Sequence, residues 1–238
     1  MLRFGGESGN LLVIRMQARL YQFLGSPFCA KARKILEFKG VEFEIVEVDY
    51  LERKELLLAT GQMMVPALTL ADGETIIDSA KIAARLEALY PEPTIMPPGW
   101  AGLHRVLADY IDNHLEESIY PVALADEREY YTRQGIDRGA MWTFIRERKY
   151  GRGFVDRMIA DDRANWARVN QALAPFEAQL EGKAFLTGRI GLADFCLYGQ
   201  LFYLAFTGEL KIPATLPNLR AYFGRIDRIS SQLESGSA

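Results

Sequence analysis

Cysteine and histidine are scarce in this chain of 238 residues, which has only two of each. Two cysteines, Cys29 and Cys196, cannot build the disulfide framework of a small secreted domain. With only His104 and His114 beside them, the spacing fits no zinc site, so no metal is expected. This composition favours a reducing compartment, and we expect a cytoplasmic protein.

Long hydrophobic runs are also missing. The longest apolar stretch, over residues 197–206, is interrupted by Gly199 and Gln200 and falls short of the roughly 20 residues that span a bilayer. The apolar run over residues 11–14 is too short for the core of a secretory signal, which needs about 7–15 residues. We therefore expect no transmembrane segment, a flexible extension over residues 1–17 and a flexible tail over residues 233–238.

No charge of one sign dominates. Lys and Arg number 28 and Asp and Glu number 31, which leaves a formal net charge of -3 at pH 7. This balance gives no general attraction to polyanions, so neither nucleic acid nor a membrane is an expected partner. What the chain does have is ordinary globular composition, 49% hydrophobic and 25% charged, over a length that suits one to two domains.

Strand and helix patterns alternate in the first part of the chain. Residues 19–24 predict a strand, and apolar residues at helical spacing follow it up to the stop signal at Lys39-Gly40. Alternating apolar and acidic residues over 42–48 predict the next strand. A short helix, a hairpin turned at Asp72-Gly73 and a capped helix then follow, over residues 53–58, 67–77 and 79–90. The predicted order is βαβαββα, over residues 18–91.

Three prolines in residues 92–98 mark a linker, and everything beyond it has helical patterns. We expect an all-helical domain over residues 99–232. Apolar stripes run along residues 103–115 and 166–180, and the segment 120–139 between them has weak periodicity and is predicted to be a connection. Residues 192–206 are apolar on nearly every side, which indicates a helix buried at the centre of a bundle.

The most informative motif is Ser26-Pro27-Phe28-Cys29, where the first predicted strand meets the first predicted helix. Serine at the N-cap and proline at the first helical position define a helix start, because the serine oxygen accepts a free backbone N–H and proline has none. On this interpretation Ser26 is only a cap and Cys29 is a small buried hydrophobe. A second motif, Thr60-Gly61-Gln62-Met63-Met64-Val65-Pro66, places Val-Pro just before the hairpin. The missing N–H of proline favours an edge or a loop there, which can face a ligand.

These motifs resemble those of glutaredoxins, whose active site reads Cys-Pro-aromatic-Cys and whose second motif ends in Val and a cis proline. Ser26 stands where the nucleophilic cysteine would be, and Pro66 stands where the cis proline would be. With the helical part that follows, the chain from residue 18 to about 232 resembles a cytosolic glutathione transferase. That resemblance implies an α/β thioredoxin-like N-terminal domain followed by an all-helical bundle domain.

A third motif, over residues 188–195, resembles the helix start in this family at which a hydroxyl residue and an aspartate form a capping box. Gly191 replaces the hydroxyl residue in this chain. Only half of the box is left, in which Asp194 accepts the backbone N–H of Gly191. We expect this motif to serve folding rather than chemistry.

The resemblance implies a glutathione transferase with glutathione as its cosubstrate. Ser26 would donate its hydroxyl hydrogen to the glutathione sulfur at a helix N-terminus, where negative charge is favoured. Val65 would pair its backbone with the cysteinyl unit of glutathione, and the helix start at Asp78-Ser79 suits the γ-glutamyl carboxylate. The residues expected to bind glutathione are Phe28, Met64, Val65, Pro66, Asp78 and Ser79.

The other substrate would be a small hydrophobic electrophile in the cleft between the domains. Tyr110, His114 and Trp142 are candidates for the walls of that cleft. An apolar stripe on a bundle helix is usually core, so a packing role fits the same residues. The resemblance also implies a homodimer that forms across the first domain.

Two other functions fit the sequence. Cys29 as the working sulfur would give a glutathione-dependent thiol reductase that acts through a mixed disulfide. A non-catalytic, transferase-like binding module also fits, because two positions depart from the family pattern. Ala59-Thr60 replaces the common Asn-Pro, and Met64 replaces the usual Lys or Gln beside Val-Pro. At least one polar contact to glutathione would then be missing.

Overall fold

The computed structural model describes residues 17–229, so residues 1–16 of the predicted extension and the whole tail predicted over residues 233–238 lie outside it. The N-terminal part has the predicted order βαβαββα. Its elements are β1 (Ala18–Gln22), α1 (Pro27–Phe38), β2 (Phe43–Glu47), α2 (Lys54–Thr60), β3 (Ala67–Thr69), β4 (Thr75–Ile77) and α3 (Ser79–Leu89). The thioredoxin-like arrangement expected from the resemblance is thus confirmed.

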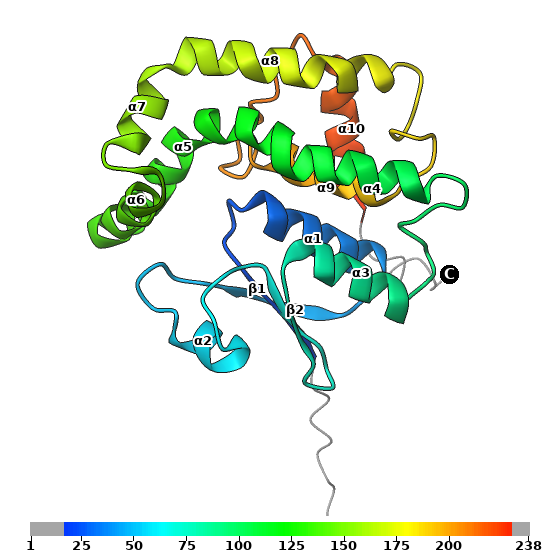
Figure 1. Cartoon of the computed structure of the whole chain (residues 1–238), viewed down its shortest axis with the longest axis horizontal. Helices are drawn as coiled ribbons and strands as arrows, with labels where there is room; N and C mark the ends of the chain where they lie inside the picture. Colours follow the sequence, from blue (N-terminus) through cyan, green and yellow to red (C-terminus); the bar gives the residue numbers. More distant parts are fainter. Residues whose placement is uncertain (1–16, 230–238) are drawn as a thin grey trace, which may run out of the picture.

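The strands form one mixed sheet in the order β2-β1-β3-β4. β1 runs parallel to β2 because α1 crosses over between them, and β3 runs antiparallel to both β1 and β4. Adjacent residues of β1 point to opposite faces of the sheet. Leu20 packs in the core beneath α1 and α3, whereas Tyr21 packs with Leu56 of α2. The sheet is therefore covered on both faces, with α1 and α3 between it and the helical part (Figure 1).

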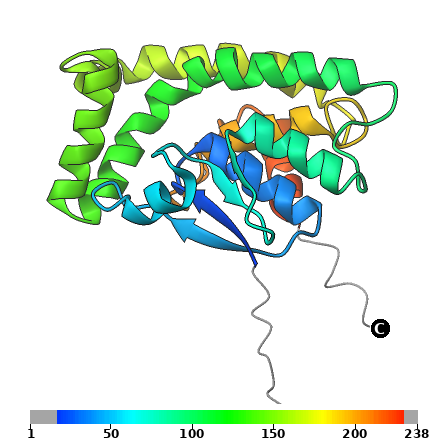
Figure 2. The same cartoon turned by 60° about the horizontal axis from the view of Figure 1, so that its bottom comes forward.

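The C-terminal part is helical throughout, as predicted (Figure 2). Its elements are α4 (Ala101–Tyr110), the π-helical turn η1 (Ile111–Leu115), α5 (Glu116–Arg133), α6 (Ile136–Tyr150), α7 (Phe154–Ala160), α8 (Asp162–Gln179), α9 (Leu192–Phe202) and α10 (Pro217–Asp227). Nearly every residue of α9 is buried, so the predicted central helix is confirmed. No helix within residues 17–229 is long and apolar enough to cross a membrane.

The connection predicted over residues 120–139 is wrong, because α5 and the start of α6 occupy this segment. Its weak periodicity has a packing cause: α5 is buried on two faces. Ile119 and Ala123 belong to the main helical core, whereas Leu124 and Tyr131 belong to a second core with residues of α6 and α7. Two buried faces spread the apolar residues around the helix and remove the single stripe that indicates a surface helix.

The apolar stripe predicted along residues 103–115 is only partly correct. Ile111 and Leu115 are buried, but Leu103 and Val106 are 42% and 66% exposed. The buried face of α4 is completed by His104 instead.

Helix α1 is buried between the sheet and the helical part. Against α9 the two backbones touch, since a Cβ on Gly199 would lie 2.3 Å from the Pro27 carbonyl oxygen. The lysines of α1 that become buried are tied to neighbouring elements. Lys34 Nζ donates to the Asp227 carbonyl at the end of α10 at 2.9 Å, and Lys39 Nζ lies 2.5 Å from Glu87 Oε2 of α3.

Helix α9 begins with a cap that comes partly from another helix. Asp194 Oδ2 accepts the Gly191 N–H at 2.9 Å, as the half capping box predicts. The missing hydroxyl is replaced by His104 of α4, whose Nδ1 accepts the Ala193 N–H at 3.2 Å. A Cβ on Gly191 would lie 2.4 Å from His104 Cε1. The imidazole and a side chain at position 191 therefore exclude each other.

The hydrogen bonds of His104 fix its protonation. His104 Nε2 lies 3.0 Å from Thr187 Oγ1, and Thr187 gives its own hydroxyl hydrogen to the Arg189 carbonyl. Nε2 therefore donates and Nδ1 accepts, which is the pattern of a neutral imidazole. Burial lowers the pKa of His104. The cap on α9 is intact only while His104 stays neutral, because a proton on Nδ1 would remove the acceptor.

We expect Gly191→Ser and His104→Ala each to lower the free energy of unfolding by about 1–3 kcal/mol. The first overpacks the site, and the second leaves the Ala193 N–H without its acceptor. The double variant should regain most of the loss, because serine at the N-cap accepts such an N–H. Chemical denaturation of the four proteins at about pH 8 measures this cycle. If the double variant lost as much unfolding free energy as the two single variants together, the mutual exclusion of His104 and a side chain at position 191 would be contradicted.

The same proteins give a pH dependence. Unfolded His104 takes up a proton below about pH 6.5, whereas the folded residue resists it, so the parent loses stability as pH falls through this region. The double variant lacks His104 and should gain relative to the parent by up to about 1.4 kcal/mol per pH unit. Asp194, whose pKa is raised to about 6 by burial, is present in both proteins. A stability difference that does not change with pH would contradict a neutral His104.

Candidate active site

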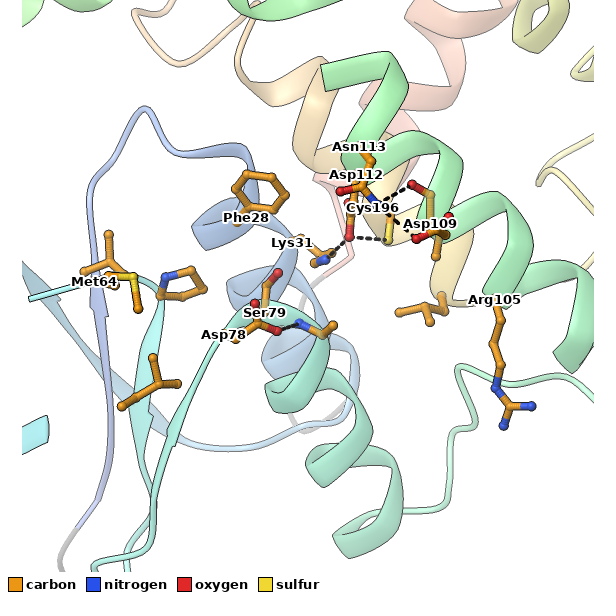
Figure 3. Close-up of a pocket in the computed structure, with 16 residues that line it drawn as sticks. Phe28, Lys31, Met64, Asp78, Ser79, Arg105, Asp109, Asp112, Asn113 and Cys196 are labelled. Carbon is orange, nitrogen blue, oxygen red and sulfur yellow. Dashed lines mark hydrogen bonds and ion pairs between the residues drawn. The ribbon is translucent and has the colours of Figure 1, made fainter. Parts of the chain in front are cut away.

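A pocket of about 490 Å³ lies where the sheet domain meets α4, η1 and α9 (Figure 3). The sheet domain contributes Phe28, Lys31, Met64, Val65, Pro66, Ile77, Asp78, Ser79 and Ala80 to its lining. The helical part contributes Arg105, Ala108, Asp109, Asp112, Asn113, Leu192 and Cys196. Within residues 17–229, no three His, Cys, Asp or Glu side chains are arranged to hold a metal ion.

The structure brings together all six residues expected to bind glutathione. They come from three separate segments, namely the start of α1, the loop before β3 and the start of α3, and each of the six lines the pocket. The fold therefore places them on one wall. Their role as glutathione ligands stays a prediction.

The loop before β3 is held in shape by its own residues. The Val65–Pro66 peptide bond is cis, as the resemblance implies. Gln62 pairs with both polar backbone groups of Met64, accepting its N–H and donating Nε2–H to its carbonyl at 2.9 Å. The hydrogen-bonded part of β3 begins at Ala67, so Val65 lies just beyond the paired strand. The glutamine of the second motif thus fixes the loop that forms one edge of the pocket.

The start of α3 is a strained and well-capped helix N-terminus. Asp78 has a φ of 89°, in a region that residues other than glycine rarely occupy. Its carboxylate accepts the N–H groups of Ala80 at 2.9 Å and Lys81 at 3.2 Å, and its own N–H donates to the Pro66 carbonyl. This contact joins the cis-proline loop to α3. The first turn of α3, with Ser79 at its start, faces the pocket.

Ser26 is the N-cap of α1, and its Oγ accepts the Cys29 N–H at 3.3 Å. Accepting this bond leaves the hydroxyl hydrogen of Ser26 for another partner. The preceding loop is fixed from β2, because Glu47 Oε1 accepts the Leu24 N–H at 2.6 Å. Ser26 is half-buried and is not one of the residues that line the pocket, in which Phe28 is the first residue of α1.

Cys29 lies in the first turn of α1, is completely buried and does not line the pocket. Burial raises the pKa of its thiol to about 12. A thiolate is the form that attacks a disulfide, so this environment opposes chemistry at Cys29. Its N–H donates to Ser26 Oγ, and the Ser26 hydroxyl also lies close enough to the Cys29 sulfur to oppose part of this rise.

The three residues predicted to line the electrophile cleft are outside the pocket. Trp142 is completely buried in the core between α5, α6 and α7 and cannot contact a ligand. Tyr110 and His114 lie on another face of α4 and η1, where their rings contact each other and Tyr110 approaches Phe176 of α8. Side chains on a helix share a face only at particular spacings, and these two do not share the pocket-facing one.

The helical wall of the pocket is made by residues that the sequence reasoning missed: Arg105, Asp109, Asp112 and Asn113. Their spacing of i, i+4, i+7 and i+8 places them on one helix face, and this polar stripe was the available signal. Asn113 Nδ2 donates to Asp109 Oδ1 at 3.0 Å, which orders the wall (Figure 3).

Lys31 also went unrecognised in the sequence. Its side chain is only 2% exposed, and its Nζ lies 2.5 Å from Asp112 Oδ2 of η1. Cys196 of α9 donates its thiol hydrogen to the same carboxylate oxygen across 3.7 Å (Figure 3). Burial raises the pKa of the Cys196 thiol to about 12. An ion pair therefore joins the sheet domain to the helical part at the pocket wall.

Comparisons with known proteins agree with this geometry. Residues 20–94 match the family model of the glutathione S-transferase N-terminal domain, and residues 136–225 match that of the C-terminal domain. The chain is 29% identical over 194 residues to a zeta-class glutathione S-transferase of Euphorbia esula, which covers 77% of this chain and 74% of the relative. It is 24% identical to the maleylacetoacetate isomerase of Pseudomonas aeruginosa over 77% of this chain and 80% of that protein.

Among solved structures, the fold resembles that of a Ceriporiopsis subvermispora glutathione S-transferase in complex with glutathione. The TM-score is 0.70 at 18% identity, over 89% of this chain and 98% of that one. At this identity the likeness concerns the fold.

We expect both cysteines to react with a soluble disulfide reagent at least tenfold more slowly in the native protein than in denaturant, because burial keeps them protonated and out of contact. The rate of thiol modification at about pH 8 measures this, and Cys29→Ser and Cys196→Ser assign each sulfur. A fast native reaction that disappears only in Cys29→Ser would contradict the burial of Cys29.

Proposed function

The chain belongs to the glutathione transferase family, and we propose that within it Ser26 activates glutathione for attack on a small hydrophobic electrophile. The observation that carries the proposal is the shared wall of the pocket. There the cis-proline loop, the N-terminus of α3 and the first turn of α1 meet, and Ser26 is the N-cap of α1, two residues before Phe28 of the lining. Val65 offers backbone for the cysteinyl unit, and Ser79 marks the helix start for the γ-glutamyl carboxylate.

One serine at a helix N-terminus can supply the free energy needed to lower the pKa of the glutathione thiol. A free thiol has a pKa of about 8.5, and lowering it by about two units requires about 2.7 kcal/mol. A hydrogen bond to a charged acceptor contributes roughly 1.5–3 kcal/mol, and the N-terminus of α1 adds about 0.3–1 kcal/mol. Ser26 caps that helix and has one hydroxyl hydrogen to donate. The remaining acceleration has to come from holding the electrophile in place.

The electrophile would sit against the α4 and η1 wall. Phe28, Met64 and Leu192 supply apolar surface there, and Asp109 and Asn113 supply polar groups that can orient it. Conjugation, dehalogenation, ether cleavage and isomerisation share formation of the thiolate as their first step. One relative is a maleylacetoacetate isomerase, so isomerisation belongs among the reactions to screen. The cytoplasmic location stays a prediction.

The burial of Cys29 favours this mechanism over a thiol reductase. The non-catalytic module remains the other candidate, since Met64 stands where a polar residue would contact glutathione and its side chain is 67% exposed. Binding of glutathione no tighter than about millimolar would favour the module.

We expect Ser26→Ala to raise the pKa of the bound glutathione thiol from well below 8.5 back toward that value, because the hydroxyl donor is lost. Ultraviolet thiolate absorbance as a function of pH measures this, and turnover of an activated aryl halide at neutral pH should fall at least tenfold. Cys29→Ser is the matched control and should change neither quantity. Saturable binding with an unshifted thiol in the parent would contradict a role for Ser26, and loss of turnover only in Cys29→Ser would favour the reductase.

A homodimer is also part of the proposal. Leu103, Val106 and Tyr110 leave an apolar row exposed on α4, which a second copy of the chain would cover. We expect the mass in solution at micromolar concentration to be twice that of the chain, and Val106→Glu to shift it toward the monomer. Gly102→Ala, on the same helix with no atom near the added methyl, is the control. A monomeric parent would contradict this expectation.

A further inference from the structure

Protein stability alone does not explain why the two charges of the Lys31–Asp112 ion pair lie at the pocket wall. Lys31 lies in the second turn of α1, and its ammonium is buried against Asp112 of η1 and lies 5.6 Å from the Phe28 ring centroid. Burying two opposite charges costs desolvation that their attraction repays only in part, so apolar residues of similar volume would serve stability about equally well. Yet both charges line the pocket in which glutathione would bind.

Six titratable or charged side chains line the pocket around this ion pair. The titratable or charged side chains that line the pocket are Lys31 on α1, Asp78 before α3, Arg105 and Asp109 on α4, Asp112 on η1 and Cys196 on α9. Asp112 Oδ2 receives both the Lys31 ammonium and the Cys196 thiol, and it is the carboxylate nearest to Lys31 (Figure 3). The pair is therefore neutral as a whole, but removing either partner leaves a single charge at the pocket wall.

Such a charge would act on the sulfur that Ser26 is proposed to bind. Lys31 follows Ser26 by five residues, which is about 7.5 Å along the helix axis. A unit charge at about 10 Å, at an effective dielectric constant of about 20, changes the pKa of a thiol by about one unit. That is half of the shift attributed to Ser26.

We propose that Lys31 and Asp112 form a charge-balancing pair that sets how readily bound glutathione gives up its thiol proton. The inference rests on the proposed function, since it concerns the same pocket and the same sulfur. Lys31 favours the thiolate, and Asp112 limits that effect while fixing the ammonium in place. In this proposal both residues act on the sulfur through their charge rather than by contact.

The test is the pH titration of bound glutathione in three variants, followed by thiolate absorbance. Lys31→Met should raise the pKa of the bound thiol by about one unit, Asp112→Asn should lower it by a similar amount, and the double variant should return close to the parent. A pair that served only to hold the domains together would move both single variants in the same direction, because each breaks the same contact. Lys31→Arg keeps the charge and should leave the pKa near the parent value.

Two results overturn the inference. The first is a pKa of the bound thiol that shifts in the same direction in Lys31→Met and Asp112→Asn. The second is a pKa that is unchanged in either variant. Thermal unfolding of each variant shows whether it is folded. If a neutral variant does not fold, the double variant Lys31→Arg, Asp112→Glu is used instead, because it keeps both charges. The bound thiol must then have the parent pKa in this double variant, and a shifted pKa overturns the inference.

Failure of the proposed function gives a different result. If the parent does not lower the pKa of the glutathione thiol, or Ser26→Ala leaves that pKa unchanged, Ser26 activation is wrong whatever the ion pair does. If Ser26→Ala raises the pKa while the two charge variants shift together, only the ion-pair inference is wrong.

Discussion

The burial of α1 on both of its long sides is the constraint from which the rest of this structure follows. One side covers the sheet and the other meets α9 so closely that Gly199 touches the Pro27 carbonyl. A helix so enclosed cannot leave its lysines in water, and each that is buried has a partner on a different element. The ammonium groups thereby tie α1 to η1, α10 and α3. The N-terminus of α1, where Ser26 lies, is held by both halves of the molecule.

The pocket forms because that fixed helix end meets two loops that are fixed by side chains. Gln62 holds the backbone before Pro66, and Glu47 holds the loop that leads to Ser26. The Asp78 N–H contact to Pro66 then joins the loop to the start of α3. A site assembled from three segments needs this order, since a shift of about 1 Å in a reacting group can cost a hundredfold in rate. The polar wall of α4 and η1 closes the pocket from the helical side.

Sequence patterns succeeded where one local rule governs a segment. Alternation and turn residues gave the strands around Asp72-Gly73, and the Ser-Pro pair gave the start of α1. They failed where tertiary contacts come from more than one side. Helix α5 was predicted to be a connection because its two buried faces erase the periodicity, and Trp142 was predicted in a cleft although it fills a core. The cap on α9 shows the same limit, because the partner of Gly191 is His104, far away in the sequence.

The sequence by itself determined the order of strands and helices up to α3, the family resemblance and six residues on the sheet-domain wall of the pocket. Those features depend on short segments whose backbone geometry is set by their own glycines, prolines and caps. Only the tertiary structure decided which residues of α4 and η1 face the pocket, that Cys29 is buried, and that Lys31 meets Asp112. These depend on how one helix is rotated against another, and that rotation is chosen by the packing of the whole core rather than by any local pattern.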